Sequence, residues 1–291
     1  MKTLAVEPTV GGLLAEGAAE LESVGLATAR QDSEWLLAEA LGVDRLALWV
    51  EPGRPVSRQV ATGFRGRIRR RMRHEPLQYI LGFEEFRGLR LRMTPAALIP
   101  RPETELLVEW ALELEDGHGP WSLAVDIGTG SGAIACALAA GAPHLHVLAV
   151  ESSMAALAVA AANISTLGLA PRVRLVAGDL FEPLAGLANA VDVVISNPPY
   201  IRTSDLAALP IEIRDWEPHA ALDGGADGTA VHRRLIGQSP GFLAPGGWLL
   251  MEVGEGQAET LRQAMAAHGF ERIEVRKDLR GIERMIGGRR G

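Results

Sequence analysis

The N-terminal part of the chain repeats apolar residues with the period of an α-helix. In "DSEWLLAEAL" (residues 32–41) the apolar positions fall on one helical face, which is the pattern of a helix packed on one side. Asp32 or Ser33 is a predicted N-cap of this helix, and Gly42 is a predicted stop. The pattern predicts a small all-α domain over residues 1–75.

The pattern changes between residues 76 and 98. Gly82 and Gly88 flank two phenylalanines, and apolar residues alternate with arginines from Leu89 to Arg92. Alternation with a period of two beside a glycine is typical of a short β-hairpin. We therefore predict a linker that contains a hairpin.

From residue 99 to residue 291, short apolar strands alternate with helical segments. The predicted strands are residues 122–128, 146–151, 172–179, 192–196 and 246–254, with two more between 270 and 288. Strands that alternate with helices indicate a mainly parallel sheet that is covered on both faces. The second domain is therefore predicted to be α/β.

Composition narrows the classes of function. The chain has 291 residues, of which 47% are hydrophobic and 22% charged, as in an ordinary globular protein. One cysteine, a start without a signal-peptide-like apolar run and the lack of a membrane-length apolar segment predict a cytoplasmic protein without disulfides or membrane spans. A net charge of −7 argues against bulk nucleic acid as the main partner.

Basic residues are nevertheless concentrated in one stretch. Seven arginines lie within residues 58–73. We favour a solvated helical face for them, because charge runs usually face water. The alternative is a contact for RNA or for an acidic partner.

The sequence "DIGTGSG" (residues 126–132) ends the first predicted strand of the second domain and opens the helix after it. Glycines let backbone amides approach a ligand closely, and ligands of open α/β sheets bind at the carboxyl ends of strands. The glycines are evenly spaced and do not form the dinucleotide signature GxGxxG. A nucleotide-like cofactor is predicted here. The predicted contacts are Asp126, Gly128, Thr129, Gly130, Ser131 and Gly132.

Two acidic residues follow at the ends of the next strands. Glu151 can accept hydrogen bonds from both hydroxyls of a ribose, which suits NAD and S-adenosylmethionine equally; the alternative is an acid favoured at a helix start. Asp179 can reach an adenine amino group, and Leu180 can pack on the ring. For this pair, a turn acid followed by a core leucine is an equally good interpretation.

The fourth strand runs into "NPPY", which is Asn197, Pro198, Pro199 and Tyr200. With the glycine loop and the acid of the second strand, this motif resembles class I S-adenosylmethionine methyltransferases that act on planar nitrogens, including adenine and cytosine amines. Such a nitrogen has to be held facing the methyl group. The Asn197 side-chain oxygen can accept one N–H, and the Pro198 carbonyl, fixed by the rigid Pro-Pro step, can accept the other. Tyr200 would pack on the planar group. The alternative is a strand cap with a Pro-rich turn.

Further blocks extend the resemblance along the chain. "HEPLQYILGFEEFRG", "LIPRPETELLVEWAL", "EPHAALDGGADG" and "KDLRGIERMI" are similar to the HemK or PrmC family of release factor glutamine methyltransferases. The resemblance implies a Rossmann-like class I methyltransferase domain with a seven-stranded, mainly parallel sheet. It also implies that the N-terminal domain, joined by the hairpin, helps to dock the substrate.

The same resemblance implies the reaction. A methyl group would pass from S-adenosyl-L-methionine to the side-chain amide nitrogen (N5) of the glutamine in the Gly-Gly-Gln motif of class I peptide chain release factors, leaving S-adenosyl-L-homocysteine. By the same match, residues 128–132, Glu151 and Asn197 would bind the cofactor. Residues 197–200 would bind the glutamine, and Arg101 and Glu103 of "PRPETE" would border its pocket. By its own physics this stretch is equally a helix started by proline with acids in the first turn. A monomer is expected.

The remaining candidates carry no chemistry in our interpretation. Cys136 lies in the helix after the glycine loop as a small buried residue. His144 and His146 have no third ligand nearby, so no metal site is expected.

The family pattern more often has Asp at position 151 and, in some members, an aromatic ring at 180, so adenine stacking on Leu180 stays open.

Three rival functions are weighed against this one. A nucleic-acid exocyclic-amine methyltransferase, acting on adenine or guanine, would need a basic channel, which the charge of −7 does not favour, so no sequence-specific nucleic-acid binding is expected. A non-catalytic cofactor sensor would have a damaged "NPPY". An NAD-dependent oxidoreductase disagrees with the glycine spacing.

Overall fold

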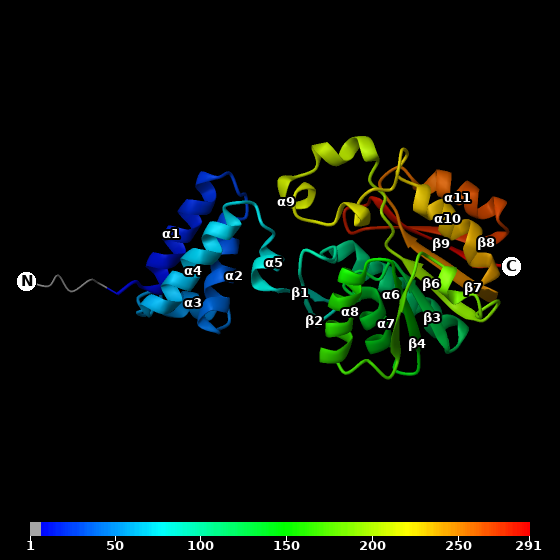
Figure 1. The fold of residues 1–291 in the computed structure, drawn as a ribbon, viewed down its shortest axis with the longest axis horizontal. Helices are drawn as coiled ribbons and strands as arrows, with labels where there is room; N and C mark the ends of the chain where they lie inside the picture. The colour runs from blue at the N-terminus through cyan, green and yellow to red at the C-terminus, as the bar shows by residue number, and fades with distance from the viewer. Residues whose placement is uncertain (1–6) are drawn as a thin grey trace, which may run out of the picture. The chain divides into compact units, whose positions relative to one another are not determined.

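The computed structural model describes residues 7–291, which form two compact units (Figure 1). The first unit ends at Gly82 and the second runs from Phe83 to Gly291. The first six residues, on which the expectation of a missing signal peptide partly rests, lie outside the described residues. Within residues 7–291, no helix has the length and apolar character needed to cross a membrane.

The first unit is helical, as the apolar period predicts. Its helices are α1 (Val10–Ser23), α2 (Ala29–Leu41), α3 (Ala47–Val50), α4 (Arg58–Arg71) and α5 (Leu77–Leu81). Gly42 ends α2 in the left-handed conformation, which confirms the predicted stop. The predicted N-cap is wrong, because α2 begins earlier, after Thr28. Asp32 lies in the first turn instead and accepts a hydrogen bond from the Thr28 hydroxyl at 2.9 Å.

The helices of the first unit pack closely around a buried ion pair. A side chain at Gly17 of α1 would place its Cβ 2.7 Å from the ring of Phe64 in α4, so glycine permits this approach. Arg71 donates to the Asp32 carboxylate at 2.7 Å, and both side chains are buried. The solvated-face interpretation of residues 58–73 is therefore wrong for Arg71, because its charge is neutralised inside the unit.

The second unit opens with the predicted hairpin, formed by β1 (Phe83–Phe86) and β2 (Leu89–Arg92). Arg87 and Gly88 both have positive φ, as a two-residue type I′ turn requires. At the end of the hairpin, the backbone N–H of Arg92 donates to Asn163 Oδ1 at 2.7 Å, and Asn163 Nδ2 donates to the Ser131 carbonyl at 2.8 Å. One asparagine thus fixes the hairpin to the glycine loop.

A seven-stranded sheet forms the centre of the second unit, with the order β5-β4-β3-β6-β7-β9-β8. The strands are β3 (Leu123–Ile127), β4 (His146–Glu151), β5 (Val173–Ala177), β6 (Val191–Ser196), β7 (Leu243–Glu252), β8 (Phe270–Lys277) and β9 (Glu283–Arg290). β3 to β7 pair in parallel, and β9 is antiparallel to β7 and β8. The predicted mainly parallel sheet is confirmed.

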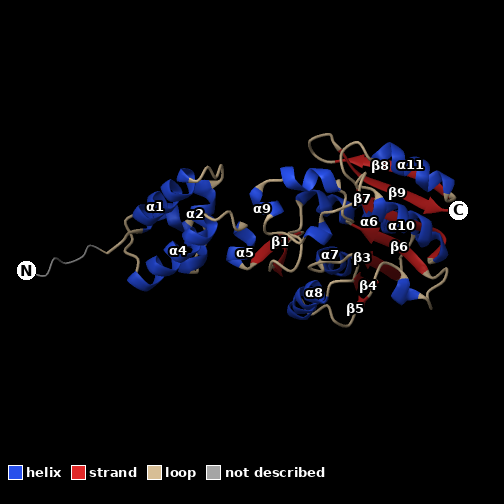
Figure 2. Cartoon of the chain, turned by 45° about the horizontal axis from the view of Figure 1, so that its top comes forward, coloured by secondary structure: helices blue, strands red, loops and turns tan. Residues whose placement is uncertain are grey.

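Helices cover both faces of this sheet (Figures 1 and 2). The main ones are α6 (Pro102–His118), α7 (Ala133–Gly141), α8 (Met154–Thr166), α10 (Ala230–Gln238) and α11 (Ala258–Ala267), and a single turn, α9, spans Ile211–Arg214. Two adjacent glycines of β9 face the helices on opposite sides of the sheet. A Cβ at Gly287 would lie 2.6 Å from Trp110 of α6, and one at Gly288 would lie 2.7 Å from Met265 of α11.

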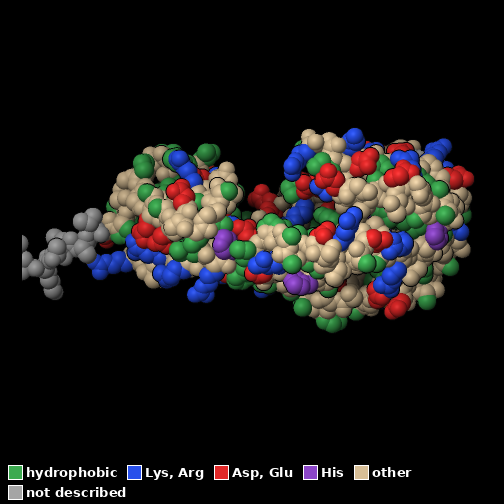
Figure 3. Space-filling model, turned by 90° about the horizontal axis from the view of Figure 1, so that it is seen from above, with side chains coloured by type: hydrophobic (Ala, Val, Ile, Leu, Met, Phe, Trp, Pro, Cys, Tyr) green, Lys and Arg blue, Asp and Glu red, His purple; other side chains and the backbone are tan. Residues whose placement is uncertain are grey.

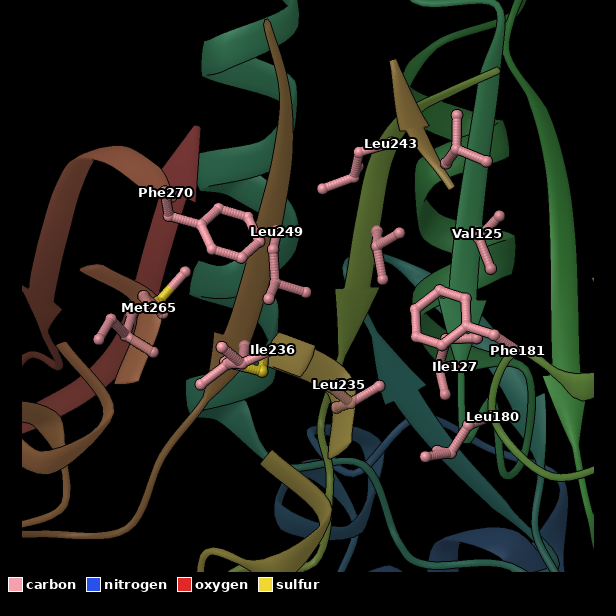
Figure 4. Close-up of a cluster of buried hydrophobic side chains, with 14 of the residues drawn as sticks. Val125, Ile127, Leu180, Phe181, Leu235, Ile236, Leu243, Leu249, Met265 and Phe270 are labelled. Carbon is pink, nitrogen blue, oxygen red and sulfur yellow. The ribbon is translucent and has the colours of Figure 1, made fainter. Parts of the chain in front are cut away.

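A buried apolar cluster lies between the sheet and the α10–α11 layer (Figure 4). Val125 and Ile127 of β3 contribute to it together with Leu235 of α10 and Met265 of α11. Because close-packed apolar side chains resist displacement, this core gives the loops at the carboxyl ends of β3 and β6 a firm base.

Candidate active site

The residues predicted to act together lie at the carboxyl ends of neighbouring parallel strands. β3 has β4 on one side and β6 on the other, so the chain reverses its direction of progress across the sheet beside β3. Ligands of open α/β sheets bind at the carboxyl ends of strands at such a switch point. The glycine loop follows β3, Glu151 ends β4, and Asn197 follows β6. The topology therefore brings all three motifs together.

The glycine loop is held from beneath by a buried aspartate. Asp126 Oδ2 accepts hydrogen bonds from the Thr129 hydroxyl at 2.5 Å and from the backbone N–H of Ala135 at 3.1 Å. Gly128, Gly130 and Gly132 all have positive φ, which only glycine adopts at little cost. Burial raises the pKa of Asp126 to about 7. This residue shapes the loop from within the protein.

A cavity of about 270 Å³ lies beside the loop and is bordered by most of the predicted cofactor contacts. The predicted residues that line it are Gly128, Gly130, Glu151, Asp179, Leu180, Asn197, Pro198 and Pro199. Four of the predicted cofactor contacts do not line it, namely Asp126, Thr129, Ser131 and Gly132. All four are buried, so the loop presents its backbone at Gly128 and Gly130 to the cavity.

Glu151 connects two of the loops around the cavity. Its Oε2 accepts the backbone N–H of Gly130 at 3.0 Å, and its Oε1 accepts that of Ser153 at 2.9 Å. Oε1 also accepts the exposed Ser152 hydroxyl at 3.4 Å. An ionised carboxylate has about four acceptor positions, so one position stays open on Oε2, and a second opens if another donor replaces the long bond from Ser152. The carboxylate is thus oriented by the backbone and remains able to accept hydroxyl groups in the cavity.

The loop after β5 supplies the opposite wall. Leu180 has a φ of 49°, which is a strained value for a residue with a side chain, and it is buried while it borders the cavity. Asp179 pairs with Arg234 of α10 at 2.5 Å, and both residues line the cavity. Leu180 thus gives this wall an apolar side chain, which can contact a flat ring.

A second, smaller cavity of about 90 Å³ lies next to the first. Asn197 lines both cavities, together with Leu98 and Ala221, while Tyr200 and Arg101 line only the smaller one. The side chain of Asn197 therefore stands in the wall between the two spaces. A group in one cavity and a group in the other would meet at this residue.

The side-chain amide of Asn197 is tied down on one side. Its Nδ2 donates to the Thr104 hydroxyl at 3.1 Å, and Thr104 donates to Glu252 Oε2 at 2.6 Å. Thr104 lies in the first turn of α6 and Glu252 ends β7. Burial raises the pKa of Glu252 to about 7. Burial also raises the pKa of Tyr200, and the negative charge of Glu252 adds to that shift.

Both interpretations of "PRPETE" have support. α6 begins at Pro102 and carries Glu103 in its first turn, while Arg101 lines the smaller cavity and donates to Glu217 at 2.6 Å. Burial raises the pKa of Glu217, although the charge of Arg101 opposes that shift. Glu103 lines neither cavity, and its negative charge contributes to the raised pKa of Glu252.

Cys136 and His144, for which we expect no chemical role, have the following surroundings. Cys136 is buried, and burial raises the pKa of its thiol to about 12. His144 contacts Glu115 at 2.5 Å. Across residues 7–291, no group of three or more His, Cys, Asp or Glu side chains is arranged to hold a metal ion.

Comparison with known proteins agrees with this geometry. Residues 12–82 match the PrmC N-terminal domain, and residues 104–209 match the methyltransferase small domain. The chain is 47% identical to the release factor glutamine methyltransferase of Geobacter sulfurreducens over 93% of both chains. It is 41% identical to that of Moorella thermoacetica over 95% of this chain and 96% of the relative. The chain belongs to the release factor glutamine methyltransferase family.

Solved structures of other methyltransferases share the fold of this family member. The catalytic domain of hMettl16, in complex with the MAT2A 3'UTR hairpin 6, matches with a TM-score of 0.56 at 19% identity, over 73% of this chain and 79% of that one. A methyltransferase from Pyrococcus furiosus matches with a TM-score of 0.52 at 19% identity, over 70% and 90%. At these identities the likeness concerns the fold, which is the Rossmann-like class I arrangement.

The surface of the second unit carries both positive and negative side chains. On the face of the second unit seen in Figure 3, acidic and basic side chains are interspersed. A protein that follows a nucleic-acid backbone carries Lys and Arg gathered into a patch or stripe. This face therefore does not favour the nucleic-acid alternative.

Three residues of the site were not found from the sequence. Thr104 stands inside the quoted "PRPETE" but carries no signal that separates it from an ordinary helix residue. Glu252 is detectable in retrospect as the one acid at the end of the apolar run "GWLLMEVG". Glu217 lies in a loop between short helices, and its pairing with Arg101 spans too long a stretch of chain for sequence reasoning.

Proposed function

We propose that this family member transfers a methyl group from S-adenosyl-L-methionine to the side-chain amide nitrogen, N5, of the glutamine in the Gly-Gly-Gln motif of class I peptide chain release factors. The observation that supports this most is the place of Asn197 in the wall shared by two cavities. The larger cavity would hold the cofactor and the smaller one the amide of the substrate.

The residues around the larger cavity fit this cofactor. Beyond its bonds to Gly130 and Ser153, Glu151 has one open acceptor position and one occupied by the long 3.4 Å bond from Ser152, so two ribose hydroxyls would be accepted once Ser152 turns away. Leu180, Ala156 and Val231 give the cavity apolar surface, as an adenine ring requires. Asp179 lies on the same wall and would accept from the adenine amino group, while it stays paired with Arg234.

Bound S-adenosylmethionine supplies an electrophilic methyl group on sulfur. The protein's contribution is to hold the weakly nucleophilic amide nitrogen in line with that carbon, and positioning of this kind supplies much of the catalysis in favourable cases. Asn197 Oδ1 would accept one N–H of the glutamine amide, and the carbonyl of Pro198 would accept the other. Tyr200, half-buried beside them, would pack on the flat amide.

No strong base is required for this reaction. The nitrogen lone pair attacks the methyl carbon, the carbon–sulfur bond breaks, and the methylated nitrogen then loses one proton. A protonated amide nitrogen is strongly acidic, so the proton leaves to solvent without a dedicated acceptor. This agrees with the absence of histidine and carboxylate side chains from "NPPY".

The partner and its location belong to the same proposal. The relatives are named for release factors as substrates, and we extend that substrate to this chain acting as a monomer in the cytoplasm, with the first unit helping to dock the release factor.

Methyl transfer can be followed directly. The full chain is incubated with methyl-labelled S-adenosylmethionine and with either a class I release factor or total RNA, and the protein product is digested for mass spectrometry. We expect one added methyl group, on the Gly-Gly-Gln glutamine. A release factor in which that glutamine is replaced by glutamate is the matched control. Label in RNA and none in the release factor would replace this function by nucleic-acid amine methylation.

A further inference from the structure

The hydrogen bonds behind Asn197 have a fixed direction. The bond from Thr104 Oγ1 to Glu252 Oε2 is 2.6 Å long, a length typical of a hydroxyl bonded to an ionised carboxylate. An ionised carboxylate only accepts, so the single hydroxyl proton of Thr104 is committed to Glu252. Toward Asn197, the Thr104 oxygen can then act only as an acceptor.

This direction determines which way the Asn197 amide faces. Its NH2 group meets the Thr104 oxygen at 3.1 Å. If the amide were turned over, its oxygen would face the Thr104 oxygen with no hydrogen between the two acceptors. The Asn197 oxygen is therefore turned away from Thr104, which leaves it available to a substrate N–H.

Glu252 also holds the other end of the motif. The Tyr200 hydroxyl interacts with the same carboxyl, and each group contributes to the pKa shift of the other. One buried acid thus acts on Asn197, through Thr104, and on Tyr200. Glu252 and Thr104 are almost fully buried, and neither lines the two cavities. Both residues consequently act on the site through others and not by touching the substrate.

We propose that Thr104 and Glu252 are positioning residues, which fix the Asn197 amide with its oxygen toward the glutamine that is methylated. This inference rests on the proposed function for its kinetic consequence. Its structural part, the fixed orientation of the Asn197 amide, stands independently of which acceptor is methylated.

The kinetic test compares Thr104→Val with Thr104→Ser. Valine keeps the shape of threonine and removes the hydroxyl, whereas serine keeps the hydroxyl. We expect kcat of Thr104→Val to fall about tenfold, the effect of one lost hydrogen bond, with cofactor affinity and thermal unfolding close to those of the wild type. Thr104→Ser should restore most of kcat. Equal loss in both variants would assign the effect to packing and overturn the proposal.

A double-mutant cycle shows whether Thr104 acts through Asn197. In an Asn197→Ala background the Thr104→Val change should cost little further activity, because residues that act through one another are not additive. Full additivity of the two effects would overturn the proposal.

A spectroscopic readout separates this inference from the proposed function. The chain contains three asparagines, Asn163, Asn189 and Asn197, so ¹⁵N-asparagine labelling gives three side-chain NH2 pairs, and Asn197→Ala identifies the relevant pair. We expect Thr104→Val and Glu252→Gln to shift the Asn197 pair and Thr104→Ser to leave it in place. An unchanged pair in Thr104→Val would refute the orientation, whatever substrate the enzyme methylates.

Discussion

At the scale of single residues, Gly130 meets two requirements at once. Its φ of 56° lies in the left-handed region, and its backbone N–H donates to Glu151 at 3.0 Å. A side chain there would strain the backbone by roughly 1–2 kcal/mol, although a Cβ would meet only the Gly128 carbonyl at 3.9 Å. The requirement for glycine is therefore one of backbone conformation and not of space.

Gly130→Ala should weaken binding of S-adenosylmethionine about tenfold, because relief of the strain would turn the N–H away from Glu151. Isothermal titration calorimetry measures the affinity. Gly168→Ala is the matched control, since Gly168 also has positive φ, with no atom near its missing Cβ, and does not line the cavity. If both variants bound the cofactor equally, loop strain would not be the cause.

Asn197→Ala should reduce turnover by about two orders of magnitude, comparable to the loss of one preorganised hydrogen bond to a reacting group, while cofactor affinity stays within about tenfold. Asn189→Ala is the control, because Asn189 precedes β6 at the opposite end of the strand from Asn197. Steady-state kinetics on the release factor together with cofactor titration give both quantities. Near-normal turnover of Asn197→Ala would contradict the mechanism.

At the scale of elements, the site depends on where helix α6 and strand β7 meet the end of β6. Glu252 at the end of β7 is faced by Glu103 from α6, by Tyr200 from the loop after β6 and by Arg284 from β9, while His232 from α10 contacts its backbone carbonyl. Burial, the largest cause, and the charge of Glu103 raise the pKa of Glu252, and the bonds from Thr104 and Tyr200 oppose this. The carboxyl therefore titrates at about 7.

This pKa predicts a pH dependence of kcat. Because the pKa is raised, Glu252 takes up a proton as the pH falls through about 7. The protonated carboxyl can then donate a hydrogen bond as well as accept one. We expect kcat to fall as the pH is lowered from about 8 to about 6. Glu252→Gln should show a low kcat without this dependence. A pH dependence that persists in Glu252→Gln would belong to another group, such as Asp126, whose pKa is also about 7.

Elements with local signals could be predicted, and contacts across the sheet could not. Strand ends at Glu151 and Asn197 follow from apolar runs that stop at polar residues, and the glycine loop follows from its spacing. The Thr104–Glu252 bond joins residues 148 positions apart, and the sequence around one of them gives no indication of the other. The start of α2 was misplaced because the Asp32 side chain is an ion-pair partner of Arg71 and not a cap.

At the scale of the whole molecule, the two units place different demands on stability. Both cavities described above are lined only by residues of the second unit. The Asp32–Arg71 pair lies in the first unit and is buried. Loss of one member of such a pair leaves a buried charge without compensation. The Asp32–Arg71 pair therefore lies in a different unit from both cavities.

Asp32→Ala should lower the free energy of unfolding of the first unit by about 3–5 kcal/mol and leave cofactor affinity unchanged. Chemical denaturation and cofactor titration measure the two effects. Glu16→Ala provides the comparison, because Glu16 pairs with Arg65 at 2.6 Å near the surface of the same unit, where an ion pair contributes about 1 kcal/mol or less. Equal losses in the two variants would mean that burial does not set the strength of the pair.

The adjacent glycines of β9 allow the helices on both faces of the second unit's sheet to pack closely on it. Trp110 rests on Gly287, and the same helix carries Thr104 two turns earlier. A methyl group at position 287 would force Trp110 and Leu250 to shift, and a shift of Trp110 would move α6 together with the hydroxyl that contacts Asn197. A residue near the C-terminus, which lines neither cavity, therefore acts as a spacer that sets how closely Asn197 is supported.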